Sequence, residues 1–360
     1  MPGNLALSPY SVASALAMTR NGAVGKTAEE MDQVLRAGPL EALNADYAGV
    51  EAALAGRAGQ KSIPGGDPVL VELTTANRLF GDKGTKFEQD FLDRLADRFK
   101  APMEQVDYRH DFEGARKRIN SWVSDRTKER IPNLIPEGIL DDYTRLVLTN
   151  AIYFKAPWAV PFRPESTQSA FFNRLEGSPV SVPFMTGRVA GWYAAGDGWQ
   201  AVEVPYAGGE LAMTVVLPAG AFGAFDRGLS GERLAEITGA LKPSEVDLRL
   251  PRWTFRTQAP LKAVLQAMGM PTAFDTRKAD LSGMSQEEKL YIKAVVHEAF
   301  VAVDEAGTEA AAATAVVVSA SSARPDPPSL TVDRPFLFLI RDRPTGEVLF
   351  LGRVVDPSAS

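Results

Sequence analysis

The side chains best suited to nucleophilic or metal chemistry are scarce in this chain of 360 residues. Cysteine is absent, which excludes disulfides, thiolate nucleophiles and zinc–thiolate sites. The two histidines, His110 and His297, lie in separate parts of the chain, so a histidine-rich metal site is excluded as well. A serine hydrolase would need one of them as its base, but we expect His110 in a charged loop and His297 in a buried strand, and no G-x-S-x-G motif is present. The sequence therefore predicts no enzyme, no metal site and no cofactor.

One segment is unusual because all of its residues are small. From Ala310 to Ala323 the chain contains only Ala, Thr, Val and Ser, and no charge lies between Glu309 and Arg324. The valines at 316–318 disfavour a helix, the scarcity of glycine disfavours a flexible linker, and the segment is too short to span a membrane. A plain surface loop is the remaining ordinary interpretation.

The alternative interpretation is a segment that becomes a strand. In a strand, side chains alternate between the two faces. One face would carry small or β-branched residues at every second position: Thr308, Ala310, Ala312, Thr314, Val316 and Val318. Residues of this size could enter a tight slot between two existing strands without a steric clash.

The remaining chain has the pattern of mixed α and β structure, with helices mainly early and antiparallel strands mainly late. We expect strands over 69–80, 144–154 and 294–303, and helices over 87–99 and 111–128. The spacing of Thr27 and Glu30 fits a capping box that would open a further helix. No repeat and no linker divides the chain, so we expect one domain over 1–360.

The stretch from Glu305 to Ala313, EAGTEAAAA, resembles the hinge of inhibitory members of the serpin family. Further stretches resemble that family in order: NLALSPYSVASALAM at 4–18, LTTANRLF at 73–80, INSWVSDRTKERIPNLI at 119–135, LTNAIYFKAPWAVPF at 148–162 and LFLGRVVDP at 349–357. The resemblance implies an α+β serpin fold with three β-sheets, eight or nine helices and an exposed reactive-centre loop at about 306–328. The family normally has a further helix before Asn4, so we expect this chain to be either naturally shortened or truncated there.

The resemblance also implies a suicide-type inhibitor of serine proteases. A target protease attacks the loop, forms a covalent acyl-enzyme and is trapped when the cut loop inserts into the main sheet as a new strand. The hinge residues are Glu305, Gly307, Thr308, Glu309, Ala310, Ala311, Ala312 and Ala313. A non-inhibitory serpin acting as a chaperone or carrier is the alternative; bulky or charged residues at the positions that insert first would favour it, and this hinge has none there.

Supporting residues follow from the resemblance one at a time. The polar cluster that controls sheet opening is matched by Ser8, Ser11, Asn150 and His297. Trp158 matches the tryptophan at the top of the main sheet, where insertion begins. Arg252 matches a basic partner of the hinge acid Glu305. Each also has an ordinary interpretation, as a satisfied buried histidine with its neighbours, a core aromatic or a surface ion pair.

Two peptide bonds are candidates for the reactive bond. Counting forward from Glu305 places the cut between Ser321 and Ser322, which suits an elastase- or subtilisin-like protease with a small pocket. Counting back from Arg334-Pro335-Phe336, which also resembles the family, places it between Arg324 and Pro325, which would suit a trypsin-like protease. The ring of Pro325 should hinder that cleavage, so we prefer Ser321–Ser322.

Composition restricts the partners. Thirty-nine basic and forty-five acidic residues give a net charge of −6, which argues against nucleic-acid binding and against a polybasic membrane patch. No stretch approaches the roughly 20 apolar residues of a membrane helix. The expected partner is the target protease, with no nucleic acid and no membrane, and the protein is expected to be a monomer. The N-terminal residues do not fit a secretion signal, and the compartment, cytoplasmic or secreted, stays open.

Overall fold

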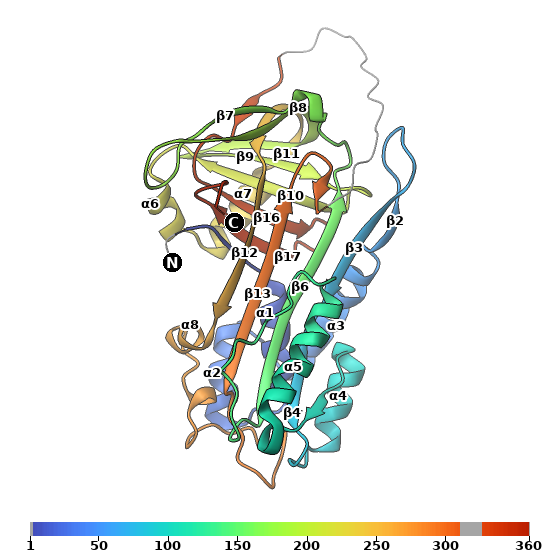
Figure 1. Ribbon diagram of the computed structural model, residues 1–360, viewed down its shortest axis with the longest axis vertical. Coiled ribbons are helices and arrows are strands. Elements are labelled where there is room, and N and C mark those ends of the chain that lie inside the picture. Colours follow the sequence, from blue (N-terminus) through green and yellow to red (C-terminus); the bar gives the residue numbers. More distant parts are fainter. Residues whose placement is uncertain (1–2, 310–325, 360) are drawn as a thin grey trace.

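The computed structural model describes residues 3–309 and 326–359. Figure 1 shows an elongated molecule in which long strands run from top to bottom and most helices surround the lower half. The described residues form eight α-helices: α1 (Pro9–Arg20), α2 (Gly25–Leu35), α3 (Leu40–Ala55), α4 (Gln89–Phe99), α5 (Tyr108–Arg126), α6 (Phe222–Arg227), α7 (Gly231–Ala240) and α8 (Lys262–Ala267). The number of helices agrees with the expectation.

The long strands belong to an eight-stranded sheet, called the main sheet here. Its order is β12-β13-β14-β6-β3-β2, with β4 between β6 and β5 at the lower end. Its strands are β2 (Gly59–Lys61), β3 (Val69–Thr75), β4 (Arg78–Asp82), β5 (Glu104–Val106), β6 (Leu146–Pro157), β12 (Trp253–Pro260), β13 (Ala294–Val303) and β14 (Gly307–Thr308). The predicted strand over 294–303 coincides with β13, and the one over 144–154 lies mostly within β6.

The other strands form a nine-stranded sheet in the order β1-β17-β16-β10-β9-β8-β11-β15, with β7 on β8. They are β1 (Leu5–Leu7), β7 (Gln168–Phe172), β8 (Val180–Gly196), β9 (Trp199–Pro205), β10 (Leu211–Pro218), β11 (Lys242–Pro251), β15 (Ser329–Thr331), β16 (Phe336–Asp342) and β17 (Val348–Val354). The long β8 pairs with β7 and β11 along most of its length and with β9 at its end. It thus joins β7 and β11 to β9 in one continuous sheet, so the described residues form two sheets where three were expected.

The apolar cores lie on both faces of the main sheet. Along β6, Leu146 and Leu148 belong to the cluster that includes α1 and α4, whereas Val147 and Ala151 belong to the cluster under α5. Higher up, Phe154 joins the largest core, between the main sheet and the nine-stranded sheet. Figure 1 shows α5 in front of the sheet and α1 behind it. Coverage on both faces explains why β6 is almost wholly apolar.

The strand predicted over 69–80 is in fact two strands. β3 ends at Thr75 and β4 begins at Arg78, and both pair with β6 in the same register. Between them, the side chain of Asn77 accepts a 2.6 Å hydrogen bond from the hydroxyl of Ser11 on α1. The interruption therefore coincides with a contact between distant segments, which the alternating pattern cannot reveal.

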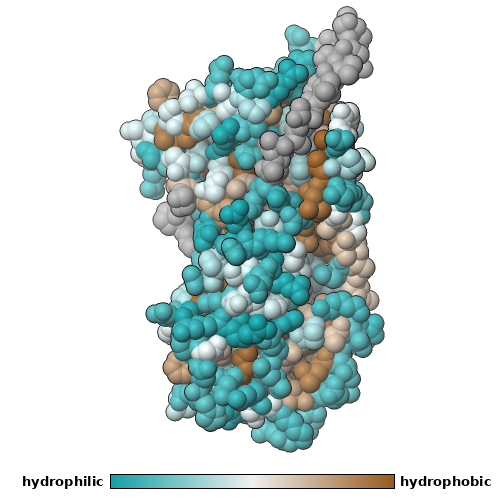
Figure 2. Space-filling view, turned by 45° about the vertical axis from the view of Figure 1, so that its right-hand side comes forward, coloured by the Kyte–Doolittle hydropathy of each residue, from teal (hydrophilic) through white to brown (hydrophobic). Residues whose placement is uncertain are grey.

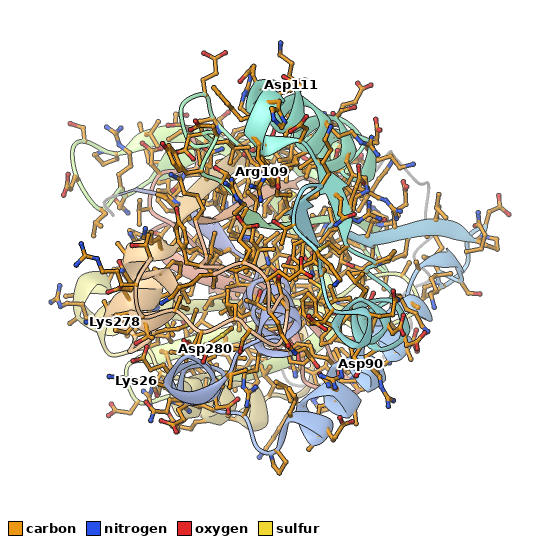
Figure 3. All side chains as sticks on the ribbon, turned by 90° about the horizontal axis from the view of Figure 1, so that it is seen from below. Lys26, Asp90, Arg109, Asp111, Lys278 and Asp280 are labelled. Carbon is orange, nitrogen blue, oxygen red and sulfur yellow. The ribbon has the colours of Figure 1, made fainter. Side chains whose placement is uncertain are left out.

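The capping box predicted at Thr27 and Glu30 is wrong. Helix α2 already begins at Gly25, and both side chains bind other segments. The Thr27 hydroxyl accepts the N–H of Asp280, and the Glu30 carboxylate accepts both the N–H and the hydroxyl of Thr272. Figure 3, a view of the lower end, shows Asp280 beside α2. The two polar side chains that the local pattern predicted to cap the helix thus form tertiary hydrogen bonds instead.

The position predicted for His110 is also wrong. It lies in the first turn of α5 rather than in a loop, and the side chain of Asp107 accepts its backbone N–H at the helix start. Figure 3 shows the neighbouring residues Arg109 and Asp111 at this end of α5, Arg109 pointing inward toward the molecule. Among the charged residues next to His110, Asp111 is exposed, whereas Arg109 is partly buried and donates to the buried Asp82.

Figure 2 shows a mainly hydrophilic face with a few hydrophobic strips on the side of β2, β3 and α3. Within residues 3–309 and 326–359, no helix is long and apolar enough to cross a membrane. The same residues contain no group of three or more histidine or acidic side chains placed to hold a metal ion.

Candidate functional site

The candidate site is the seam of the main sheet, the line between β6 and β13. The two strands pair in parallel as far up as Ile152 and Ala299. Above this level β14 lies between them and is antiparallel to both, with Thr308 opposite Val303 on one side and Ala156 on the other. Two hinge residues, Gly307 and Thr308, therefore already occupy the top of the seam.

A tight turn brings the hinge into this position. Asp304 directly follows β13, and its carboxylate accepts the N–H groups of Ala306 at 2.9 Å and Gly307 at 3.2 Å. Burial raises the pKa of Asp304, and these two N–H donors oppose the rise. At Gly307 the backbone passes so close to β6 that a Cβ atom would lie 2.2 Å from the carbonyl oxygen of Ala156. Only glycine fits this position without displacing the strand.

Thr308 is the deepest hinge residue that the structure describes. Its side chain faces the core, the residue is 2% exposed, and its hydroxyl lies 2.6 Å from that of Tyr206. The ring of Tyr206 stacks on Trp158 with 4.6 Å between ring centroids. Trp158 in turn donates from its indole N–H to the carbonyl of Asp304 at 2.9 Å and from its backbone N–H to that of Ala306 at 2.9 Å. Trp158 thus lies directly after the upper end of β6, in contact with the hinge, and its role at the start of insertion stays a prediction.

Glu305 is held from the side by Arg252. The Arg252 Nε atom donates to a Glu305 carboxylate oxygen at 2.8 Å, and Arg252 Nη2 and the Thr167 hydroxyl bond the same oxygen. Burial would raise the pKa of Glu305, but these donors hold it below its ordinary value. The Glu305 side chain is 9% exposed and that of Arg252 is 42% exposed. This half-exposed pair is worth about 1 kcal/mol or less.

The chain leaves the sheet at Glu309. Its backbone is left-handed, with φ of 51°, and its N–H donates to the carbonyl of Ala302 at 2.8 Å. One carboxylate oxygen forms an ion pair with Arg130, whose guanidinium lies 5.5 Å over the ring of Phe300. The other oxygen is buried and has no hydrogen-bond partner in the described part of the chain. Burial raises the pKa of Glu309, and Arg130 opposes the rise.

Lower on the seam, the four polar residues expected in one cluster meet. Asn150 on β6 and His297 on β13 are direct cross-strand partners, and the imidazole Nδ1 is hydrogen-bonded to the Asn150 side-chain oxygen. His297 Nε2 accepts the backbone N–H of Ser8 at 3.0 Å, which assigns the ring proton to Nδ1. The Ser8 hydroxyl oxygen accepts the N–H of Ser11, and Ser11 continues the network to Asn77.

This network makes His297 a structural group. Burial lowers the pKa of His297 to about 4, so the ring is neutral at pH 7. Its Nε2 atom bonds a backbone N–H and therefore cannot act as a base for a serine hydroxyl. His110 faces solvent beside Asp107. Opening the seam at this level would break the bond between His297 and Asn150.

Four contributing residues were missed by sequence reasoning: Tyr206, Thr167, Arg130 and Asn77. Each contacts the site from a distant part of the chain. Asn77 and Arg130 lie within the stretches 73–80 and 119–135 that resemble the family, whereas Tyr206 and Thr167 lie in none of the stretches given above. The other predicted residues lie outside the described part of the chain: Ala310, Ala311, Ala312, Ala313, Ser321, Ser322, Arg324 and Pro325.

Comparisons with known proteins extend over almost the whole chain. The family model described as "Serpin (serine protease inhibitor)" matches residues 2–357. The leukocyte elastase inhibitor of Xenopus tropicalis is 36% identical over 363 residues, and that of Homo sapiens is 35% identical over 368 residues. In each case the match covers 99% of this chain and 93% of the relative. A solved structure of thyroxine-binding globulin with thyroxine matches with a TM-score of 0.85 and 28% identity, covering 100% of this chain and 94% of that one.

Proposed function

Because the chain belongs to the serpin family, we propose that it inhibits an elastase-like serine protease by inserting its cleaved loop into the seam of the main sheet. The family and fold predicted from the sequence are confirmed. Its relatives are named inhibitors rather than enzymes, in agreement with the prediction of a non-enzyme. The observation that carries the insertion mechanism is the position of Gly307 and Thr308 between β6 and β13.

The chemical step belongs to the protease. Its serine oxygen adds to the carbonyl carbon of Ser321, the peptide bond to Ser322 breaks, and Ser322 leaves as a free amine. The acyl-enzyme ester then ties the protease to the end of the loop. The names of the relatives support Ser321–Ser322 over Arg324–Pro325, because elastase-like enzymes accept small side chains.

The inserted strand would continue β14 downward. Thr308 faces the core, so the alternation of a strand turns every second following residue the same way. These positions hold only alanine, threonine and valine as far as Val318. The fourteen residues from Thr308 to Ser321 span roughly 46 Å as a strand, enough to carry a tethered protease to the other end of the sheet.

Insertion is driven by the hydrogen bonds gained when the single pairing between β6 and β13 is replaced by two pairings, one on each side of the new strand. Insertion breaks the parallel pairing between β6 and β13 and makes antiparallel ladders with both strands. At about 1 kcal/mol net per new hydrogen bond, the gain is on the order of 10 kcal/mol. That is comparable with the stability of a whole domain, so it can distort the active site of the bound protease.

The polar contacts along the seam have a controlling role in this proposal. The Arg252–Glu305 pair fixes the upper end of the hinge, and the Asn150–His297 bond closes the seam below the inserted residues. Both must rearrange without leaving a polar or charged group buried and unpaired. We expect the whole chain to act as one domain and as a monomer, bound covalently to one protease.

A non-inhibitory serpin acting as a carrier or chaperone is the alternative. Thyroxine-binding globulin, a structural neighbour, is described in complex with thyroxine. The hinge of the present chain favours inhibition, because the inserting positions hold small residues.

The test is incubation with elastase-, subtilisin-, chymotrypsin- and trypsin-like proteases. We expect a denaturant-resistant complex with an elastase-like enzyme, and sequencing of the released C-terminal peptide should give Ser322 as its first residue. Cleavage by every protease without a stable complex would contradict the inhibitor. A complex formed only with a trypsin-like enzyme, with the cut after Arg324, would contradict the target class and the reactive bond.

A further inference from the structure

A second region suited to binding lies at the edge of the main sheet, apart from the hinge. An open cavity of about 240 Å³ is bordered by α1, the C-terminal ends of α3, α4 and α5, and the interruption between β3 and β4. Figure 1 shows α3, α4 and α5 grouped on this side of the lower half. Three cationic side chains line it, Arg78, Lys100 and Arg126, together with the hydroxyl groups of Ser14, Thr74 and Thr75.

Two of the three cations of this cavity have no ion-pair partner in the described part of the chain. Lys100 and Arg126 are exposed and form no ion pair with any residue in 3–309 or 326–359. Arg78 donates to Glu104 at 2.6 Å through Nη1 alone, and its buried Nε has no partner there. The one acidic lining residue, Glu51, already accepts the hydroxyl of Tyr10. The cavity therefore offers positive charge and unused donors but few acceptors.

The cationic groups also gather around one aromatic ring. The guanidinium of Arg78 lies 4.5 Å from the ring centre of Trp122, and that of Arg126 lies 5.9 Å from it. Burial lowers the pKa of Arg78, Glu104 opposes this, and the charges of Arg126 and Arg118 lower it further. An anion placed between Arg78 and Arg126 would relieve this repulsion.

We propose that this cavity binds a small phosphate monoester with a compact apolar body. Lys100, Arg126 and the unused donors of Arg78 hold the dianionic phosphate, because two cations without counter-charges match a dianion. Leu54, Phe99 and Trp122 contact the apolar body. A long polyanion does not fit, since α3, which borders the cavity, contains no lysine or arginine. This proposal does not rest on the proposed inhibitory function.

Phenyl phosphate is the probe, and isothermal titration calorimetry on the uncleaved full chain is the measurement. Inorganic phosphate tests the phosphate group without the apolar ring, and phenol tests the ring without the phosphate. Benzoate tests a ring that carries a single negative charge. Each of the three should bind at least tenfold more weakly than phenyl phosphate. The double substitution Lys100→Gln with Arg126→Gln should weaken binding about tenfold or more, in line with the loss of one to two charge-assisted bonds. The matched control is Arg94→Gln with Arg98→Gln, the same charge change on exposed residues of α4 outside the lining. It should leave the affinity unchanged.

Two further readouts separate binding from a change in folding. Phenyl phosphate should raise the melting temperature of the wild type and of the control but not of the Lys100/Arg126 variant. Arg126→Glu alone should weaken binding more than Arg126→Gln. Absence of binding at millimolar phenyl phosphate, or equal affinity of the Lys100/Arg126 variant and the wild type, would overturn the proposal. No protease is present in these experiments, so their failure would leave the inhibitor proposal untouched, and the reverse also holds.

Discussion

The hydroxyl of Thr308 lies 2.6 Å from the hydroxyl of Tyr206 in the core between the two sheets. Thr308 belongs to the hinge, and Tyr206 follows a strand of the other sheet. The hinge is therefore already joined to the core by a buried polar contact before any protease has cut the loop. Insertion needs to extend an existing strand rather than start a new one.

Thr308→Arg should convert the inhibitor into a substrate. The arginine would have to lose its hydration in a buried position without an acidic partner, at a cost of several kcal/mol. Insertion would then be slower than hydrolysis of the acyl-enzyme. The readouts are the yield of denaturant-resistant complex and the number of inhibitor molecules consumed per protease. Thr308→Ser is the control and should retain inhibition. A wild-type yield of complex from Thr308→Arg would contradict the claim that residue 308 must be buried during insertion.

Gly307→Ala should displace the hinge from the top of the sheet. The added methyl group would lie 2.2 Å from the carbonyl oxygen of Ala156, so β14 or β6 must move. We expect the substitution to lower the free energy of unfolding by roughly 1–3 kcal/mol, as inserting an extra methyl group into a tightly packed site usually does. Amide hydrogen exchange at Thr308 and Glu309 should accelerate, while Ala306→Ser should leave it unchanged. Equal exchange rates in Gly307→Ala and the wild type would show that the close approach is not required.

The Arg252–Glu305 pair should contribute a coupling energy of about 1 kcal/mol or less, because Arg252 is half-exposed. A double-mutant cycle with Arg252→Gln and Glu305→Gln, read by hydrogen exchange of the hinge, measures it. The pKa of Glu305 is held below its ordinary value, so the coupling is present at neutral pH and is lost as the pH falls through that lowered pKa. A coupling that persists in strong acid would argue against an ion pair.

The neutral, buried state of His297 should make stability depend on pH. Its pKa is about 4 in the folded chain and about 6.5 when unfolded, so the unfolded state binds a proton first as the pH falls. Stability is therefore lost from about pH 6.5 down to about pH 4, by roughly 3 kcal/mol in total. Urea unfolding of the wild type and of His297→Gln over this range gives the difference. If the free energy of unfolding of the wild type and of His297→Gln changed in parallel with pH, the burial of a neutral His297 ring would be contradicted.

The hinge and the cluster could be anticipated from sequence because short, ordered motifs mark them. Glu305 to Glu309 form one continuous stretch, and Asn150 and Ser8 lie in stretches that resemble the family. Tyr206 and Thr167 lie in none of these stretches, and each reaches the hinge from a segment more than a hundred residues away in sequence. Arg130 lies in the stretch 119–135, but nothing in that stretch shows that its side chain pairs with Glu309. No local pattern specifies such contacts; they depend on how the two sheets pack.

The same reason explains the errors in local structure. Thr27 and Glu30 have the spacing of a capping box, but Asp280 and Thr272 offer them partners that only the folded chain brings near. The apolar pattern of β6 was interpretable because burial on both faces leaves a continuous signal. Periodicity thus predicts how an element is buried better than it predicts which polar group its side chains bind.

The most direct test compares the melting temperature of the uncleaved protein with that of protein nicked once in the loop by a non-target protease. If the seam accepts the loop as a new strand, nicking should release on the order of 10 kcal/mol and raise the melting temperature by roughly 10–20 °C or more. An unchanged melting temperature after complete nicking would mean that the loop does not insert, and the proposed mechanism would be wrong.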